Sequence, residues 1–260
     1  MNDDARDSAA SEKSSSPEST RTSDSPSRNG KRRSPSSRGS SPLSPKEAEL
    51  AEAAAERIIR KSGFEWAPPS RLAPAVGHDV QLEHLKGLRG ATTTLGKRIA
   101  ITPHEHRYRA AEEFALGHEI AHHYVPEGMD QEAQEAFCDR VSAALLLPKT
   151  SFLASLAERH FDLPAVRRDH PWASWQVIFW RAAELVSGTS AALWKDGSPF
   201  DCRCARPCPQ ERPSSTELTV VRLAVSRRGH AAVLDDGTLA MAWDVPRGRV
   251  HWVYCLMFPV

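Results

Sequence analysis

The stretch Gly-His-Glu-Ile-Ala-His-His-Tyr at residues 117–124 constrains the fold more than any other part of the sequence. Within it, His118, Glu119 and His122 form the pattern His-Glu-x-x-His. Residues four apart on an α-helix lie on one face, so both imidazoles can reach one metal ion at about 2.1 Å. Glu119 lies about 100° further round the helix axis, nearer to a water molecule at the ion than to the ion itself. The pattern therefore predicts a buried helix that carries a catalytic metal.

A second helix offers the remaining ligand, because catalytic zinc sites normally have three protein ligands and a water. Glu135 follows His122, and Pro126-Glu127-Gly128 breaks the chain between them, so the second helix can fold back antiparallel to the first. Asp139 lies one turn after Glu135, on the same face. We predict that Glu135 binds the metal and that Asp139 accepts a hydrogen bond from a ligating histidine. Glu132, one turn before Glu135, is the competing ligand.

Apolar residues at three- and four-residue spacing predict several helices. The helix with the metal motif is expected to begin at Thr102-Pro103 and to run to about Tyr124, and the next helix extends from about Asp130 to Leu147. Further helices are expected at residues 46–61, 69–76, 151–160 and 172–186. Ser44-Pro45 has the form of an N-cap followed by proline at the first helical position.

Strands are expected in two places. Between Val80 and Ile101 the pattern suggests a short meander, with strands at 81–82, 90–92 and 96–101. The C-terminal part has strand-like segments at 217–225, 231–234, 239–243 and 250–258, with a hairpin-turn signal at Asp235-Asp236-Gly237. The chain is therefore expected to be an α+β protein, with a mostly helical core, a small sheet and a β-rich C-terminal region.

The first 45 residues differ in composition from the rest of the chain. They consist mainly of Ser, Pro, Arg, Asp and Gly, with almost no large apolar side chain. Such a segment cannot bury enough surface to offset its conformational entropy, so we expect a disordered tail at residues 1–45. Its basic run, residues 30–34, is interpreted as a solvated segment rather than a nucleic-acid contact.

Composition also limits the class of protein. The formal net charge is +1, unlike the strongly basic balance of a dedicated nucleic-acid binder. No apolar run approaches the ~20 residues of a transmembrane helix, and the polar N-terminus lacks a signal-peptide core. Five cysteines, an odd number, fit a reducing compartment better than a disulfide framework. We expect a soluble, cytoplasmic protein that neither spans a membrane nor requires nucleic acid.

Two further clusters leave alternatives open. Cys202, Cys204 and Cys208 could form part of a second metal or redox site, or they could be free thiols in a Pro- and Arg-rich linker. Three arginines lie close in sequence to three tryptophans and suggest either a binding surface or, as preferred here, tryptophans of the core. These residues are Arg167, Arg168, Arg181, Trp172, Trp175 and Trp180.

Three stretches resemble the ImmA/IrrE family of zinc metallopeptidases: residues 96–103, residues 113–124 around the metal motif, and residues 135–148. The last stretch, Glu-Ala-Phe-Cys-Asp-Arg-Val-Ser-Ala-Ala-Leu-Leu-Leu-Pro, is similar to the family pattern Glu-x-x-Ala-Asn-x-Phe-Ala-Ala-x-Leu-Leu-Met-Pro. It departs from that pattern at Cys138, Asp139, Val141 and Ser142. Asp139 keeps a hydrogen-bonding side chain in place of the family's asparagine. The family's third metal ligand falls on Glu135.

The resemblance covers roughly residues 46–190 and implies a zincin-like, gluzincin-like peptidase domain, which we place at residues 46–195. The residues themselves, and not the resemblance, indicate a Cys/Pro-rich linker at 196–215 and a small β-rich region at 216–260. It implies one catalytic Zn²⁺ held by His118, His122 and Glu135, with Glu119 as the general base. It also implies regulatory cleavage of a protein substrate, a helix-turn-helix repressor. Candidates for stabilising the oxyanion are His106, Tyr108, His123 and Tyr124.

Two rival functions remain at this stage. One is a non-catalytic zinc-binding sensor or regulatory module that acts by protein or DNA binding. The other is a DNA-binding regulator that uses the helices after Pro148. The presence of Glu119 favours catalysis over the first, and the near-neutral charge argues against the second.

Overall fold

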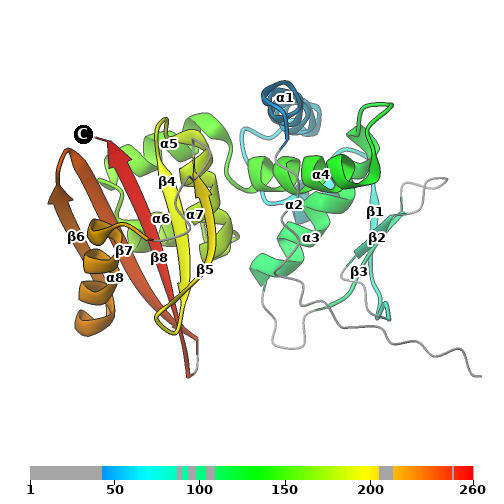
Figure 1. The fold of residues 1–260 in the computed structure, drawn as a ribbon. Coiled ribbons are helices and arrows are strands. Elements are labelled where there is room, and N and C mark those ends of the chain that lie inside the picture. Colours follow the sequence, from blue (N-terminus) through cyan, green and yellow to red (C-terminus); the bar gives the residue numbers. More distant parts are fainter. Residues whose placement is uncertain are drawn as a thin grey trace, which may run out of the picture. The chain divides into compact units, whose positions relative to one another are not determined.

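The computed structural model describes residues 43–86, 90–92, 98–103, 109–204, 213–247 and 249–259, with only the backbone at 201–204. The expectations for residues 1–42, for His106 and Tyr108, and for Cys208 fall outside the described residues, as do those for the side chains of Cys202 and Cys204. Within them, the α+β class is confirmed (Figure 1). No helix of the described ranges is long and apolar enough to cross a membrane.

The first helix, α1, spans Pro45–Ser62 and begins where the sequence predicts. The Ser44 hydroxyl accepts a hydrogen bond from the backbone N–H of Glu47, whose carboxylate in turn accepts from the backbone N–H of Ser44. This reciprocal capping satisfies two amide groups that would otherwise lack partners at the helix start. The helix ends at Gly63, whose φ of 76° lies in the left-handed region.

A three-stranded sheet follows the short helix α2 (Pro69–Ala75). Its strands are β1 (Asp79–Leu82), β2 (Gly90–Thr92) and β3 (Arg98–Ile101), in the order β1-β3-β2. Strand β3 pairs parallel with β1 and antiparallel with β2. Strand β2 is therefore an edge strand among the described strands. Strands are thus found where they were expected, but the expected meander is wrong, because β3 lies between β1 and β2 and pairs parallel with β1.

Helices α3 (Arg109–Ala121) and α4 (Gln131–Leu146) pack antiparallel, with the 3₁₀ turn η1 (His122–Tyr124) after α3. The two helices lie close together at Gly117, where an added Cβ would lie 2.6 Å from the Ser142 hydroxyl oxygen and 3.3 Å from the Ser142 Cα. That hydroxyl donates to the carbonyl of Phe114 at 2.7 Å. The glycine is required here because any side chain would force the two helices apart.

In the second half of the described chain, four helices pack against a larger sheet. The helices are α5 (Lys149–Glu158), α6 (Leu163–Asp169), α7 (Trp175–Leu185) and α8 (Ser215–Arg227). The strands are β4 (Ser190–Lys195), β5 (Ser198–Cys204), β6 (His230–Asp235), β7 (Thr238–Arg247) and β8 (Val250–Pro259). All neighbouring pairs are antiparallel, in the order β5-β4-β8-β7-β6.

Both faces of this sheet are covered, because successive side chains of a strand point to opposite faces. In β4, Leu193 packs with the apolar residues of α5–α7, whereas its neighbour Trp194 packs with Val220 and Ala224 of α8. Strand β8 repeats the alternation with Tyr254 on the first side. Figure 1 shows α8 (orange) lying against the sheet. The strands are therefore apolar on both faces.

Two expectations for the C-terminal part are wrong. Residues 217–225 form most of helix α8 and not a strand, because the Ser214 hydroxyl caps the helix by accepting from the N–H of Glu217. The apolar positions Val220, Val221 and Ala224 then cover the sheet at helical spacing. The segment 196–215, expected as a linker, contains strand β5, which pairs with β4.

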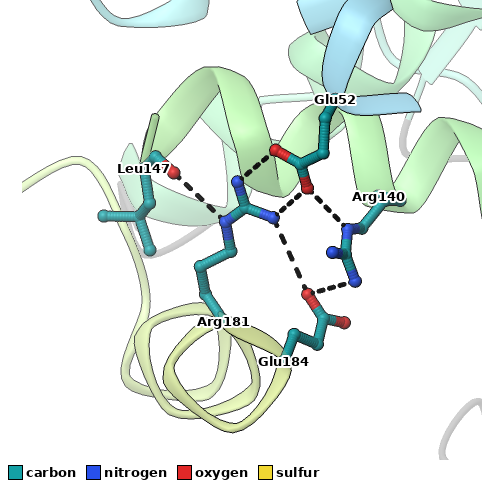
Figure 2. Close-up of polar contacts among 5 residues, drawn as sticks. All are labelled: Glu52, Arg140, Leu147, Arg181 and Glu184. Atoms are coloured by element: carbon teal, nitrogen blue, oxygen red, sulfur yellow. Dashed lines mark hydrogen bonds and ion pairs between the residues drawn. The ribbon is translucent and has the colours of Figure 1, made fainter. Parts of the chain in front are cut away.

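A buried ion-pair network joins α1, α4 and α7 (Figure 2). The Arg181 side chain is fully buried, and its guanidinium donates to both carboxylate oxygens of Glu52 and to the carbonyl of Leu147. Arg140 bridges Glu52 and Glu184, at 2.9 and 2.8 Å. Arg181 is thus part of the interior rather than of a binding surface. Trp180 is buried as well, which confirms the core interpretation for that tryptophan.

Candidate metal centre

His118 lies between two carboxylates from α4. Its Nδ1 is 2.8 Å from Asp139 Oδ1, and its Nε2 is 3.4 Å from Glu135 Oε2. The bond to Asp139 fixes the ring so that the proton stays on Nδ1 and the Nε2 lone pair is available to a metal. This is the arrangement that the four-residue spacing of Glu135 and Asp139 predicts.

His122 completes the pair of imidazoles, although it lies in η1 rather than in α3. The two rings are 4.9 Å apart between centroids. The Nδ1 atom of His122 is 3.5 Å from the Sγ atom of Cys138. A ligand atom from each of His118, His122 and Cys138 lies within 4.8 Å of the others, so these three also form a possible metal-binding group.

Glu119 is buried beside the edge strand β2, with 8% of its surface exposed. A Cβ added at Gly90 would be 2.7 Å from Glu119 Oε1, so the carboxylate lies directly against the glycine backbone. The Thr92 hydroxyl donates to the backbone carbonyl of Glu119 at 3.2 Å. Strand β2 therefore holds the helix turn and the carboxylate together.

Charge and burial act in opposite directions on the ionisable groups of the centre. Burial lowers the pKa of His118, but the hydrogen bond and charge of Asp139, with the charges of Glu135 and Glu119, outweigh it and raise the pKa. Burial, reinforced by the same three carboxylates, raises the pKa of the Cys138 thiol far above its usual range. The centre thus has a strongly negative potential, which favours a cation.

One pair of the predicted ligand atoms has the separation expected around a tetrahedral zinc ion. Ligand atoms about 2.1 Å from such an ion are about 3.4 Å from one another, and His118 Nε2 lies 3.4 Å from Glu135 Oε2. Two imidazoles and one carboxylate also form a known catalytic ligand set for zinc. Cys138 is fully buried on α4, whereas the Glu135 side chain is 46% exposed on the side of His118.

The other candidates lie elsewhere. Glu132 is exposed in the first turn of α4. The His123 ring packs on His78, with centroids 4.5 Å apart, and the Arg57 guanidinium lies over the Tyr124 ring. The proximity of Cys138 to His122 was not predicted from the sequence. The sequence feature that could have indicated this proximity is the position of Cys138 between Glu135 and Asp139 on the same helix.

Comparisons with known proteins give one matching family model and a similar fold. Residues 75–168 match the peptidase family model described as the IrrE N-terminal-like domain, which confirms the resemblance drawn from the sequence. A search of curated proteins finds no significant match. A solved structure described as a Mycobacterium tuberculosis transcriptional regulator is similar in fold, with a TM-score of 0.59 and 14% identity. The alignment covers 82% of this chain and 81% of that one.

Proposed function

Since residues 75–168 match the IrrE N-terminal-like peptidase domain, we propose that the protein is a zinc-dependent peptidase that cleaves a regulatory protein. One observation carries the proposal. The buried carboxylate of Glu119 lies one residue from His118, and His118 is itself held between Glu135 and Asp139. A structural zinc site needs closed coordination, whereas this constellation adds an acid–base group next to the ligands.

Each residue has a separate role in this proposal. His118, His122 and Glu135 would hold the ion, and Asp139 would orient His118. Zinc, when bound, supplies a Lewis acid that polarises the scissile carbonyl and lowers the pKa of water toward ~7. Glu119 would accept the proton of the attacking water and deliver it to the leaving amine. Its contact with Gly90 restricts the carboxylate to one position before substrate arrives.

The same strand offers a place for an extended peptide. Strand β2 lies at the edge of the described three-stranded sheet and contacts α3 beside Glu119. An extended segment that pairs with an edge strand gains main-chain hydrogen bonds largely independent of its side chains. A substrate bound in this way would pass next to Glu119, which supports a peptide as the substrate class.

A second function is supported by the structural comparison. The similar solved structure is described as a transcriptional regulator, and the likeness extends over most of both chains. A zinc-binding regulatory module without peptidase activity would have the same fold. The two functions differ in what Glu119 does: a peptidase needs its carboxylate, and a binding module needs only the ligands.

The substrate proposal comes from the family resemblance, which implies a helix-turn-helix repressor. The test is co-expression with such a protein encoded nearby, comparing the wild type with Glu119→Gln and with Glu112→Gln. Glu112 lies on α3 two turns before Glu119 and serves as the matched control. We expect cleavage by the wild type and the control but not by Glu119→Gln, as judged by immunoblot and by mass of the fragments. Equal cleavage by all three, or none with zinc fully bound, would contradict a peptidase.

The ligand set is tested separately by metal analysis of purified variants. We expect His118→Ala, His122→Ala and Glu135→Ala to lose zinc, and Glu132→Ala and Cys138→Ser to retain it. Loss of zinc from Cys138→Ser with retention in Glu135→Ala would assign the third ligand to the thiol instead.

A further inference from the structure

A groove separate from the metal ligands lies between α1, the end of α2, and η1 with the residues that follow it. Its volume is about 590 Å³, within the ~300–1,000 Å³ range of small-molecule sites. The lining residues are Leu50, Ala53, Ala54, Arg57, Lys61, Val76, His78, His123, Tyr124, Val125, Pro126 and Phe137. The groove thus includes His123 and Tyr124, the two residues of the metal motif that have no role in the proposed catalysis.

The polar part of the lining is basic. Arg57 and Lys61 are exposed one turn apart on α1, and the lining contains no Asp or Glu. Among the described residues, neither of these cations forms an ion pair with a carboxylate. The Arg57 guanidinium lies 5.9 Å from the centroid of the Tyr124 ring, which holds it over the groove.

The remaining wall is apolar and continuous with the basic part. Leu50 and Ala54 precede Arg57 and Lys61 at helical spacing, so all four lie along one face of α1. Leu50 is 40% exposed, so its side chain is accessible to a ligand in the groove. The groove thus pairs an apolar wall with two cations at one end, which suits a molecule with one apolar and one acidic part.

We propose that this groove binds a small organic anion with an apolar or aromatic body. Its acidic group would lie between Arg57 and Lys61, and its body would cover Leu50 and Ala54. A ligand without charge leaves the two cations unused, and a purely inorganic anion leaves the apolar wall exposed to water. The combination of both contacts defines the ligand class.

Binding of the anion in the groove would affect the metal centre through η1. This part of the inference rests on the proposed function. In this three-residue turn His122 faces Cys138 and His118, while His123 and Tyr124 line the groove. A ligand that fixes the conformation of His123 and Tyr124 also fixes His122. Thermodynamic linkage then requires zinc and the anion to change each other's affinity by the same factor.

The test uses 8-anilinonaphthalene-1-sulfonate, an aromatic sulfonate, and N-phenyl-1-naphthylamine, which has the same ring system without the charge. Both are titrated by fluorescence into the full chain, the Arg57→Met/Lys61→Met variant, and Arg60→Met, an exposed position of α1 outside the groove. Methionine keeps the apolar stem of each side chain. We expect saturable sulfonate binding that is about tenfold weaker in the double variant and unchanged in Arg60→Met, from two exposed ion pairs. The neutral probe should bind more weakly than the sulfonate, with the same affinity for all three proteins.

Several results would overturn the inference. These are no saturable sulfonate binding, equal binding to the double variant, or equal binding of the neutral probe. Thermal unfolding of each variant checks that the changes do not come from partial unfolding, and shifts of the His123 and Tyr124 NMR signals locate the probe. The coupling is tested by repeating the titration with zinc-loaded and zinc-free protein. Equal affinities there would disprove the coupling but leave the binding site, so this failure is distinct from failure of the peptidase proposal.

Discussion

Asp139 contacts the candidate metal centre through His118. Its Oδ1 is 2.8 Å from Nδ1 of that histidine, and it is the strongest influence that raises the pKa of the ring. Partners of this kind fix the orientation of a ligating imidazole, and their loss typically costs ~10–100-fold in metal affinity.

We therefore expect Asp139→Ala to bind zinc about 10–100-fold more weakly than the wild type, as measured by competition with a chelator of known affinity. Asp139→Asn, which keeps a hydrogen-bond acceptor, should lose less. Glu132→Gln, on the same helix, is the control and should leave the affinity unchanged. Unchanged zinc affinity in Asp139→Ala would show that the histidine needs no such partner.

Gly90 determines where the Glu119 carboxylate lies. A Cβ at this position would be 2.7 Å from Glu119 Oε1 and 2.8 Å from its Cγ, so the side chain has to move. A displacement of about 1 Å in a catalytic group can cost ~10²-fold in rate. Gly90→Ala should consequently reduce the proposed peptidase rate by about that factor without loss of zinc.

The measurement is the single-turnover cleavage rate alongside zinc occupancy. Ala91→Ser is the matched control, because the next side chain along a strand points to the opposite face. A normal rate in Gly90→Ala would show that the carboxylate tolerates the shift, and loss of zinc would show that the strand supports the ligands instead.

The residues of the site differ in how far the sequence predicts them. The positions of His118, Asp139 and Glu135 follow from helical spacing, because one helix turn fixes which side chains share a face. The contact of Gly90 with Glu119 joins a strand and a helix far apart along the chain. No local pattern encodes such a contact, since it depends on how the elements pack.

Among the helices and strands, sequence features with a defined local geometry gave correct predictions. The Ser44 cap and the proline after it predicted the start of α1 correctly. The run Thr219-Val220-Val221 misled, because β-branched residues favour strands. In α8 the cap at Ser214 and the burial of one helical face against the sheet outweigh that preference.

The network around Arg181 links elements that the sequence leaves unconnected. Glu52 has the appearance of an ordinary exposed position of α1, yet its carboxylate accepts from Arg181 Nη2 at 2.7 Å and from Arg140 Nε at 2.9 Å. The Arg181 side chain is fully buried, so its charge depends on Glu52 for compensation.

Removal of the Glu52 charge should destabilise the folded state. We expect Glu52→Gln to lower the free energy of unfolding by about 3 kcal/mol, because it leaves a buried guanidinium without its main counter-charge. Glu184→Gln should cost less than about 1 kcal/mol, since Glu184 lies 3.9 Å from Arg181 and the second cation of the network is partly exposed.

Urea denaturation of the single variants and of Glu52→Gln/Arg181→Met measures these effects. The double variant removes both charges and should be more stable than Glu52→Gln alone. If the double variant is the less stable of the two, packing of the arginine stem matters more than its charge.

For the whole molecule, the three apolar clusters explain how the elements hold together. One cluster joins α1–α4 with the small sheet, and the other two lie on opposite faces of the five-stranded sheet. Each sheet face has its own helical cover, so strands β4 and β8 need apolar side chains at every position in their centres. A sequence with that pattern shows no clean alternation. Strand β8 was nevertheless predicted, because it is rich in aromatic and β-branched residues, whereas β4 contains two alanines, which are depleted in strands, and was not predicted.

Stability of the whole molecule should also depend on pH through Glu217, a buried carboxyl in the first turn of α8. Burial raises its pKa, and the hydrogen bonds from Trp194 Nε1 and the Ser214 backbone oppose the rise only in part. The unfolded state loses this proton near the ordinary pKa of 4.5, whereas the folded state keeps it to a higher pH. Its contribution is therefore fully present below pH 4.5 and is lost as the pH rises through the raised pKa.

Glu217→Gln should remove that loss, so its stability relative to the wild type should increase as the pH rises above 4.5. The unsatisfied amide N–H of the glutamine is also expected to change the free energy of unfolding by a constant amount. The measured quantity is therefore the slope of the stability difference with pH.

Glu47→Gln provides a control of opposite sign, because the Ser44 hydrogen bonds lower the pKa of Glu47. The stability that Glu47 contributes is present above 4.5 and lost as the pH falls through the lowered value. Urea denaturation at several pH values from about 3.5 to about 7.5 measures both slopes. Parallel curves for Glu217→Gln and the wild type would mean that the buried carboxyl titrates alike in both states, and that water reaches it in the first turn of α8.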